Sequence, residues 1–234
     1  MSGEGVTLVR LKGAWVVLTD ARACPRGFAP GQLPELLARH LPFRPAVLYP
    51  RQRHTNLLYT FSGPLPSAGS CQEVGVCDGL ITGEPGVALA IQTADCLPIA
   101  LVGGGVIAAV HAGWRGLAAG IVSRAPHLIA AQFGVPPQEL SALIGVGIAP
   151  CHYPVGEEVA AAVAAAVGTQ EGVLLDGRLD LAAAALQILT KAGVPWQAIH
   201  VKPGCTACSP HYHSHRRDGA KAGRQWFAVV LEPR

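Results

Sequence analysis

Two residues that can bind a metal or carry out chemistry, Cys96 and His111, lie at the open end of a predicted β-hairpin. The apolar runs 97–102 and 106–110 form its strands, and the glycines at 103–105 separate them. Paired glycines favour a tight hairpin because they tolerate the positive φ angles of a type I′ turn. The pattern therefore predicts that the thiol and the imidazole come together.

The length of the turn decides which residue faces Cys96. A two-residue turn at Gly103-Gly104 pairs Cys96 with His111, and paired residues share a face with Cβ atoms about 4.5–5.5 Å apart. A three-residue turn pairs Cys96 with Ala112, and a shared face then requires a distorted strand. Both registers keep the side chains near enough for zinc, whose bonds are about 2.0–2.3 Å long. By itself, such a pair is more often a buried cysteine beside a strand-end histidine.

The neighbours of this pair favour a functional site. Asp95 adjoins Cys96, and the run Trp114-Arg115-Gly116 follows His111 into a predicted helix start. A guanidinium and free backbone N–H groups are suited to holding phosphate or another anion. We therefore predict that Asp95 and Arg115 contact the substrate.

A second group of reactive side chains lies near the end of the chain. The pair Cys205 and Cys208 has the spacing of half a zinc site, and three histidines follow it at His211, His213 and His215. A lone pair of this kind lacks a distant second pair. We therefore favour a role in shaping the rim of the active site, with Cys205 buried near the substrate. For His152, beside Cys151, a loop position without special function is favoured.

Basic residues gather beyond that group, at Arg216, Arg217, Lys221 and Arg224. Such a run is usually a solvated face. The flanking Ser214 and glycines also fit a loop that faces phosphate. Both interpretations stay open, and Arg216 and Arg217 are predicted substrate contacts.

The elements that must position these residues alternate between strand and helix. Strands are predicted at 6–11, 14–18, 86–92, 97–102, 106–110, 141–148, 198–201 and 226–231. Pro126 lies inside the helical stretch 117–133, which is therefore either kinked or divided into two helices. Asp180 is the expected N-cap of a helix over 181–192, and valines every four residues over 155–167 indicate a further helix. The mixture predicts one layered α/β domain over 1–234.

Composition excludes several classes of protein. Half of the 234 residues are apolar, only 14% are charged, and the net charge is +3, so neither a nucleic acid nor a membrane is an expected partner. No apolar run reaches the roughly 18 residues that span a bilayer, and no signal segment is seen at the N-terminus. Seven cysteines, an odd number, fit reduced thiols and a cytoplasmic location.

Several motifs together resemble one known family. The segments 77–82 (CDGLIT), 93–98 (TADCLP) and 111–116 (HAGWRG) strongly resemble the YfiH-like laccase-domain proteins, also described as a purine nucleoside phosphorylase family with polyphenol-oxidase-like members. Gln52-Arg53-His54 is similar to its first block, and residues 144–156 and 205–224 are similar to its later blocks. The resemblance covers residues 50–230, in the family's order.

The resemblance implies a site and a fold. It implies a zinc site, with copper as the alternative metal, in which His54, Cys96 and His111 are both ligands and catalytic residues. It implies phosphorolysis of adenosine, inosine and S-methyl-5′-thioadenosine, so that a purine nucleoside and phosphate are the partners, and adenosine deamination as a side activity. The implied fold is a single-domain, layered α/β/β/α sandwich with mixed sheets. The sequence leaves the oligomeric state open between a monomer and a small homo-oligomer.

Two other enzyme classes remain as alternatives. A copper polyphenol oxidase needs several coppers and multiple His-x-His pairs, and the chain offers such spacing only among His211, His213 and His215. A cysteine hydrolase acting on peptidoglycan precursors would use Cys96 as nucleophile and His111 as base. A non-enzymatic role for the hairpin as an interaction surface is the fourth possibility.

Overall fold

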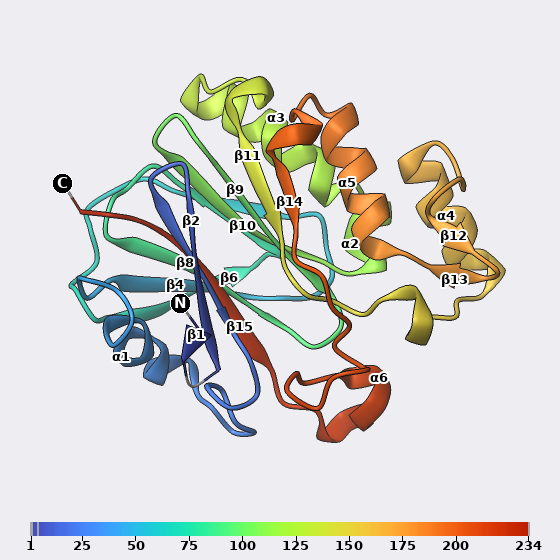
Figure 1. Ribbon diagram of the computed structural model, residues 1–234. Helices are drawn as coiled ribbons and strands as arrows, with labels where there is room; N and C mark the ends of the chain where they lie inside the picture. Colours follow the sequence, from blue (N-terminus) through green and yellow to red (C-terminus); the bar gives the residue numbers. More distant parts are fainter. Residues whose placement is uncertain (1, 4, 234) are drawn as a thin grey trace.

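Two β-sheets lie face to face and helices cover their outer sides, as Figure 1 shows for the computed structural model. The structure describes residues 2–3 and 5–233. Strands of the first sheet follow the order β1 (Ser2–Gly3), β2 (Val6–Leu11), β3 (Ala14–Thr19), β15 (Gln225–Leu231), β8 (Val87–Thr93), β4 (Ala46–Arg51) and β6 (Cys71–Val76). Those of the second follow the order β14 (Ile199–Val201), β11 (Ser141–Ile144), β9 (Leu97–Gly103), β10 (Val106–Ala112), β7 (Gly79–Thr82) and β5 (Leu58–Phe61).

Both sheets are mixed. In the first, β4 runs parallel to β6 and β8, whereas β15 is antiparallel to β3 and β8. In the second, β5 is parallel to β7 and β11 is parallel to β14, and the other pairs are antiparallel. A two-stranded ribbon of β12 (Leu174–Leu175) and β13 (Arg178–Leu179) lies beside them.

Three apolar clusters define the layers. One lies between the sheets and includes Leu89, Ile107 and Phe227. Another packs the second sheet against its helices, and the third packs the first sheet against the helix α1 (Leu33–Ala38). The helices over the second sheet are α2 (Trp114–Ala118), α3 (Ile121–Phe133), α4 (Glu157–Val167) and α5 (Leu181–Lys191). The predicted layered α/β/β/α arrangement with mixed sheets is confirmed.

The hairpin of β9 and β10 forms, but its register differs from both predicted ones. Gly104 and Gly105 occupy the turn with φ angles of 56° and 77°, so Val106 pairs with Gly103 and His111 pairs with Pro98. Gly103 stays in the strand because it packs against η2, the 3-10 turn Pro137–Glu139: a Cβ there would lie 2.5 Å from the carbonyl oxygen of Glu139. Cys96 therefore lies just before β9 and faces no strand partner.

Two helical predictions are resolved by the structure. The stretch 117–133 is divided, but Gly120, with a φ of 87°, makes the break, and Pro126 lies inside the continuous α3. Asp180 caps α5 as predicted, since its carboxylate accepts a hydrogen bond of 2.9 Å from the Ala183 N–H. No helix in the described ranges has the length and the apolar character to cross a membrane.

Candidate functional site

The side chains of His54, Cys96 and His111 converge from three parts of the chain. His54 lies between β4 and β5, Cys96 lies between β8 and β9, and His111 belongs to β10. One ligand atom from each lies within 4.8 Å of the others. His54 Nε2 is 3.7 Å from Cys96 Sγ, and the two imidazole rings stand at 72° with centroids 4.9 Å apart. Two imidazoles and a thiol form a set of donors that suits zinc.

A buried carboxylate, Asp78, holds two of these residues in place. Asp78 Oδ1 accepts a hydrogen bond of 2.9 Å from His111 Nδ1, which leaves the Nε2 of His111 for a metal. The same carboxylate accepts from the backbone N–H groups of Arg53, His54 and Thr55 at 3.1, 2.9 and 2.7 Å. Asp78 has no exposed surface. One side chain therefore fixes both the ring of His111 and the loop that carries His54.

The loop of His54 is anchored a second time by Gln52. Its amide nitrogen donates to the carbonyl oxygen of Gln92 at 2.8 Å, and its amide oxygen accepts from the N–H of Gln92 at 2.8 Å. These two bonds attach the loop to the end of β8. His54 itself has a φ of 58°, a backbone conformation that costs energy outside glycine and is concentrated at functional sites.

Gly113 allows Cys96 and His54 to approach each other. A Cβ at this position would lie 2.7 Å from the sulfur of Cys96 and 3.0 Å from Cδ2 of His54. Any larger residue would have to displace one of them. The first glycine of the HAGWRG motif, Gly113, is therefore required by space rather than by backbone conformation.

Without a metal, the site forms a charged pair. Burial alone would raise the pKa of Cys96, but the hydrogen bonds and charges of His111 and His54 lower it to about 6. Burial would lower the pKa of His111, but its hydrogen bonds to Asp78 and Cys96 raise it to about 9. The pKa of Asp78 is held well below its usual range by its hydrogen-bond donors, although burial opposes this. At neutral pH the geometry favours a thiolate beside an imidazolium.

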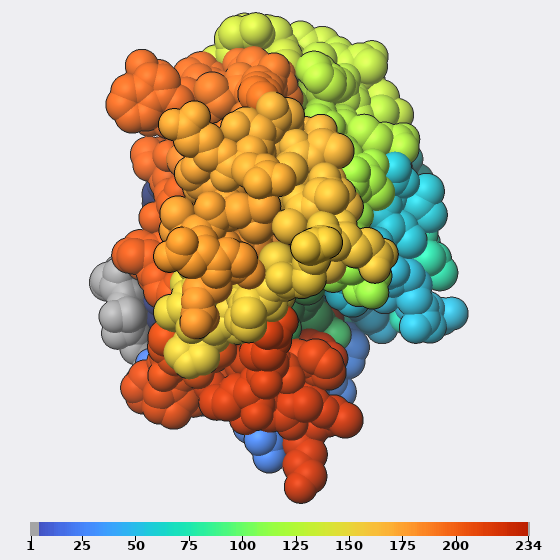
Figure 2. Space-filling view, turned by 90° about the vertical axis from the view of Figure 1, so that its right-hand side faces the viewer, coloured from blue at the N-terminus to red at the C-terminus, as the bar shows by residue number. Residues whose placement is uncertain are grey.

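The three residues line a cavity of about 720 Å³, within the range of small-molecule sites. Figure 2 shows the hollow where the red segment around α6 (His215–Asp218) meets the yellow and yellow-green segments. Five arginines line it, and one of them, Arg51, is paired with Glu73 at 2.6 Å. The others are Arg53, Arg115, Arg216 and Arg224. Guanidinium groups in this number are suited to a phosphate.

Three of the predicted substrate contacts lie in this cavity. Arg115 stacks on the ring of Trp114 with its guanidinium carbon 4.4 Å from the centroid, and Arg216 lies 5.1 Å from the ring of Tyr153. Asp95 also lines the cavity, but it is 9% exposed and its oxygens accept from Thr206 Oγ1 and from the Arg216 N–H, both at 2.6 Å. Asp95 therefore positions these neighbours.

Two other predicted substrate contacts lie elsewhere. Among the described residues that line the cavity, neither Cys205 nor Arg217 is present. The guanidinium of Arg217 donates to the carbonyl oxygens of Thr206, Ser209 and Tyr212 at 3.0, 2.9 and 2.8 Å, so it shapes a loop. Cys205 is buried in that loop. The prediction for Arg217 came from the basic run that begins at Arg216. The prediction for Cys205 came from the Cys205–Cys208 pair at the expected rim of the site.

Sequence reasoning missed the parts played by Asp78, Gln52 and Tyr153. Tyr153 lines the cavity, and burial, followed by the charge of Cys96, raises the pKa of its hydroxyl to about 12. The only sequence signal for Asp78 was a lone acid inside the otherwise uncharged CDGLIT motif. Gln52 belongs to the Gln52-Arg53-His54 motif, but the sequence indicated no role for it because its hydrogen-bond partner is 40 residues away.

Comparison with known proteins leads to one family. The chain matches the family model described as multi-copper polyphenol oxidoreductase laccase over residues 33–232. A Deinococcus radiodurans protein named purine nucleoside phosphorylase is 43% identical over 162 residues, which are 67% of this chain but only 62% of that relative. Purine nucleoside phosphorylase ORF3 of Streptomyces griseus is 36% identical over 82% of this chain and 79% of its own length.

The fold leads to the same group of proteins. The crystal structure of YlmD from Geobacillus stearothermophilus superposes with a TM-score of 0.86 at 28% identity, covering 99% of this chain and 98% of that one. The matched region contains all three converging residues. The chain belongs to the multi-copper polyphenol oxidoreductase laccase family, the group of YfiH-like laccase-domain proteins whose motifs its sequence carries.

Proposed function

We propose that this protein is a zinc-dependent purine nucleoside phosphorylase whose metal is held by His54, Cys96 and His111. The observation that carries the proposal is the convergence of these three donors, within 4.8 Å of one another, in an arginine-lined cavity of about 720 Å³. The names of the Deinococcus and Streptomyces relatives support the choice of reaction.

The donor set fits a catalytic rather than a structural metal. Three protein ligands leave a fourth position for water or substrate, and bound zinc supplies a Lewis acid there. Asp78 orients His111 from behind, as carboxylates commonly do for metal-bound histidines. Copper is the alternative metal, because imidazole and thiolate ligands bind it as well.

The arginines account for the second substrate. In phosphorolysis an oxygen of phosphate forms a bond to the anomeric carbon of the ribose, while the bond from that carbon to the purine nitrogen breaks and the base leaves with the electron pair. Arg115 and Arg216 hold the phosphate in this scheme, since both line the cavity. Adenosine, inosine and S-methyl-5′-thioadenosine are the proposed nucleosides, and deamination of adenosine is the proposed side activity.

A nucleoside assay with and without phosphate tests the proposal. Wild-type protein should release hypoxanthine from inosine only when phosphate is present. His111→Ala should lower the turnover by more than about 100-fold, because loss of an outer partner of a metal site already costs 10–100-fold. His200→Ala is the matched control, since that histidine is an exposed residue of β14. Unchanged turnover in His111→Ala would exclude the site.

A cysteine hydrolase is the second candidate. The arrangement of Cys96, His111 and Asp78, with a thiolate beside an imidazolium held by a carboxylate, is that of an activated nucleophile. Metal dependence separates the two candidates. Chelation followed by gel filtration should abolish phosphorolysis, whereas a thiol hydrolase would keep its activity and lose it on alkylation of Cys96.

The family name also suggests a third candidate, the oxidation of polyphenols by bound copper. Among the described residues, the cluster with Cys96 contains two histidines and the other cluster of possible ligands contains one. A multicopper centre needs more histidines than either cluster offers. We therefore do not extend the proposal to polyphenol oxidation. All seven cysteines are unpaired, which supports a reducing, cytoplasmic setting for the proposed enzyme.

A further inference from the structure

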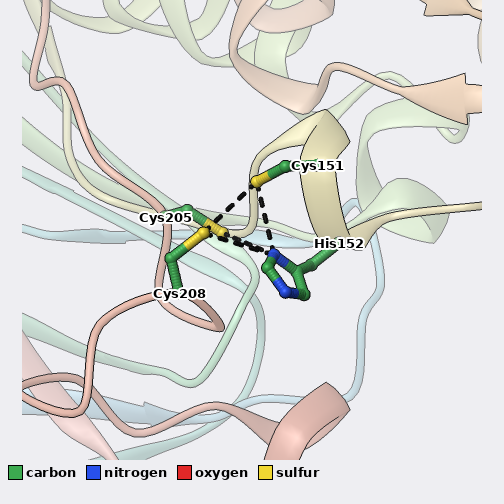
Figure 3. Close-up of side chains that lie close together, drawn as sticks. All are labelled: Cys151, His152, Cys205 and Cys208. Carbon is green, nitrogen blue, oxygen red and sulfur yellow. Dashed lines mark hydrogen bonds between the residues drawn. The ribbon is translucent and has the colours of Figure 1, made fainter.

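A second group of ligand-type side chains lies outside the cavity. Cys151, His152, Cys205 and Cys208 each offer one ligand atom within 4.8 Å of the others. Figure 3 shows the four side chains directed toward one another, two from the 3-10 turn η3 (Pro150–His152) and two from the loop that follows β14. None of them is among the residues that line the cavity. The group is therefore distinct from the site of His54, Cys96 and His111.

The distances in this group are close to those between the ligand atoms of one tetrahedral zinc ion. Bonds of about 2.3 Å to sulfur and 2.0–2.1 Å to nitrogen place the ligand atoms roughly 3.5–3.8 Å apart. Here the sulfurs of Cys151 and Cys208 are 3.4 Å apart, and Nδ1 of His152 is 3.3 Å from the first and 3.2 Å from the second. Nδ1 of His152 is also 4.0 Å from the sulfur of Cys205. A disulfide would need about 2.05 Å between sulfurs.

Two arginines hold the contributing loops in this arrangement. Arg178 donates to the carbonyl oxygen of Cys151 at 3.0 Å and so fixes η3. Arg217 donates to carbonyl oxygens on both sides of Cys208. The N–H of Ala149 donates to the sulfur of Cys205 at 3.3 Å, a bond that favours the thiolate. Three thiolates, a neutral imidazole and Zn²⁺ carry a net charge of −1, which Arg178 can offset, whereas the guanidinium of Arg217 is already paired with Asp218 at 2.9 Å.

Two histidines that the sequence offered as further ligands beside Cys205 and Cys208 have other positions in the structure. His213 is buried, with its Nε2 2.7 Å from the carbonyl oxygen of Cys24, and His215 lines the cavity instead. The missing half of the site comes from the adjacent residues Cys151 and His152, more than fifty positions earlier. Neighbouring ligands in a short turn do not have the spacing of a zinc motif, so the sequence hides them.

We propose that Cys151, His152, Cys205 and Cys208 form a second, structural zinc site. Four protein ligands close the coordination sphere, which is the arrangement of a structural rather than a catalytic metal. The ion would join the two loops that frame one side of the cavity. Tyr153, next to His152, lines that cavity, and Thr206, next to Cys205, donates to Asp95. The proposal does not rest on the proposed enzymatic function.

Zinc content per chain tests this site separately from the first. Four proteins are purified under reducing conditions without added metal: wild type, Cys208→Ser, His54→Ala and Cys71→Ser. We expect two zinc ions per chain in the wild type and in Cys71→Ser, the control for a thiol outside both clusters, and one in each of the other two variants. A zinc content in Cys208→Ser equal to that of the wild type would overturn the second site.

The same comparison separates failure of this proposal from failure of the proposed function. If the wild type holds one zinc that His54→Ala removes and Cys208→Ser does not, the second site is wrong and the first stands. If only Cys208→Ser loses zinc, the second site stands and the proposed catalytic zinc fails. A Cys208→Ala variant repeats the measurement if the serine variant does not fold.

Alkylation of the wild type gives an answer that needs no variant. Treatment with N-ethylmaleimide, followed by peptide mass spectrometry, should leave Cys151 and Cys208 unmodified in the zinc-loaded protein, although both are exposed. Adding a strong chelator should make both react. Reaction without the chelator would overturn the proposal, and so would protection that a reducing agent removes and a chelator does not, because that result identifies a disulfide.

Discussion

At the scale of single residues, the candidate active site depends on a buried carboxylate, Asp78, that is not among the residues lining the cavity. Asp78 accepts hydrogen bonds from His111, from the hydroxyl of Thr55 and from three successive backbone N–H groups. These donors lie on two separate segments of the chain. A buried anion with this many donors stays ionised and fixes the geometry of both segments at once.

Asp78→Asn should therefore weaken the site without changing any proposed ligand. The amide has one acceptor oxygen and brings an NH2 group toward backbone donors, so we expect a 10–100-fold loss of zinc affinity. We also expect the free energy of unfolding to fall by about 3 kcal/mol, as when a buried ionic pair is broken. Competition with a chromogenic chelator and urea denaturation measure the two effects.

The control for this variant is Asp176→Asn. Asp176 is exposed and has a φ of 48°, a conformation that asparagine adopts readily. Both zinc affinity and stability should stay at wild-type values there. Wild-type zinc affinity in Asp78→Asn would show that the hydrogen bonds of Asp78 do not orient His111.

The sequence predicted the three converging residues but not the hydrogen bonds of Asp78 that orient two of them. Residue type and a hairpin indicated Cys96 and His111, and only the family resemblance indicated His54, because it lies on a separate loop. The partners of Asp78 lie 23 to 33 positions away, so no local pattern identifies them. Roles of this kind depend on long-range packing.

At the scale of elements, the turn between β9 and β10 combines two kinds of glycine. Gly104 and Gly105 both have positive φ angles, as a type I′ turn requires. A Cβ on Gly104 would collide with the side chain of Val135, whereas a Cβ on Gly105 would meet nothing within 4 Å. The first is thus constrained by space and backbone, and the second by backbone alone.

Alanine at the two turn positions should separate these constraints. Gly105→Ala should cost about 1–2 kcal/mol for the left-handed backbone. Gly104→Ala should cost a further 1–3 kcal/mol for overpacking against Val135, for a total of about 2–5 kcal/mol. Guanidinium denaturation of both variants gives the difference. Equal losses of stability would contradict the predicted clash.

Several strands with strong apolar patterns were predicted, whereas two strands at the sheet edges, β5 and β6, were not. The strands β8 and β15 were predicted to within a residue because they are buried along almost their whole length. The edge strands β5 and β6 contain no fully buried residue, so their sequences lack a clear alternation of buried and exposed positions. Both predicted registers of the hairpin were wrong. Packing of Gly103 against η2 keeps that residue in the strand, so Gly104 and Gly105 form the turn.

At the scale of the whole molecule, stability comes from the contact between the sheets. Phe227 on β15 is 1% exposed and packs in the cluster that joins both sheets. Phe227→Ala should lower the free energy of unfolding by about 3–5 kcal/mol. Trp196→Ala is the control, since that indole is 66% exposed and should change stability by less than about 0.5 kcal/mol. Urea denaturation compares them, and a small loss for Phe227→Ala would contradict the assigned core.

The layered architecture was within reach of sequence, but the assignment of strands to sheets was not. Alternation of apolar runs and helices indicates an α/β domain. The first sheet, however, joins strands from both ends of the chain to the middle, as β15 pairs with β3 and β8. Such pairing brings together residues about 200 positions apart, and local patterns carry no information about it.

The two connections that carry His54 and Cys96 share a path through the fold. Each leaves a strand of the first sheet, β4 or β8, and enters one of the second, β5 or β9, while His111 lies within the second sheet. An ion bound by all three residues would therefore link the two sheets to each other. The chain can close on it only after the two sheets have docked, so capture of the metal would mark the completion of folding.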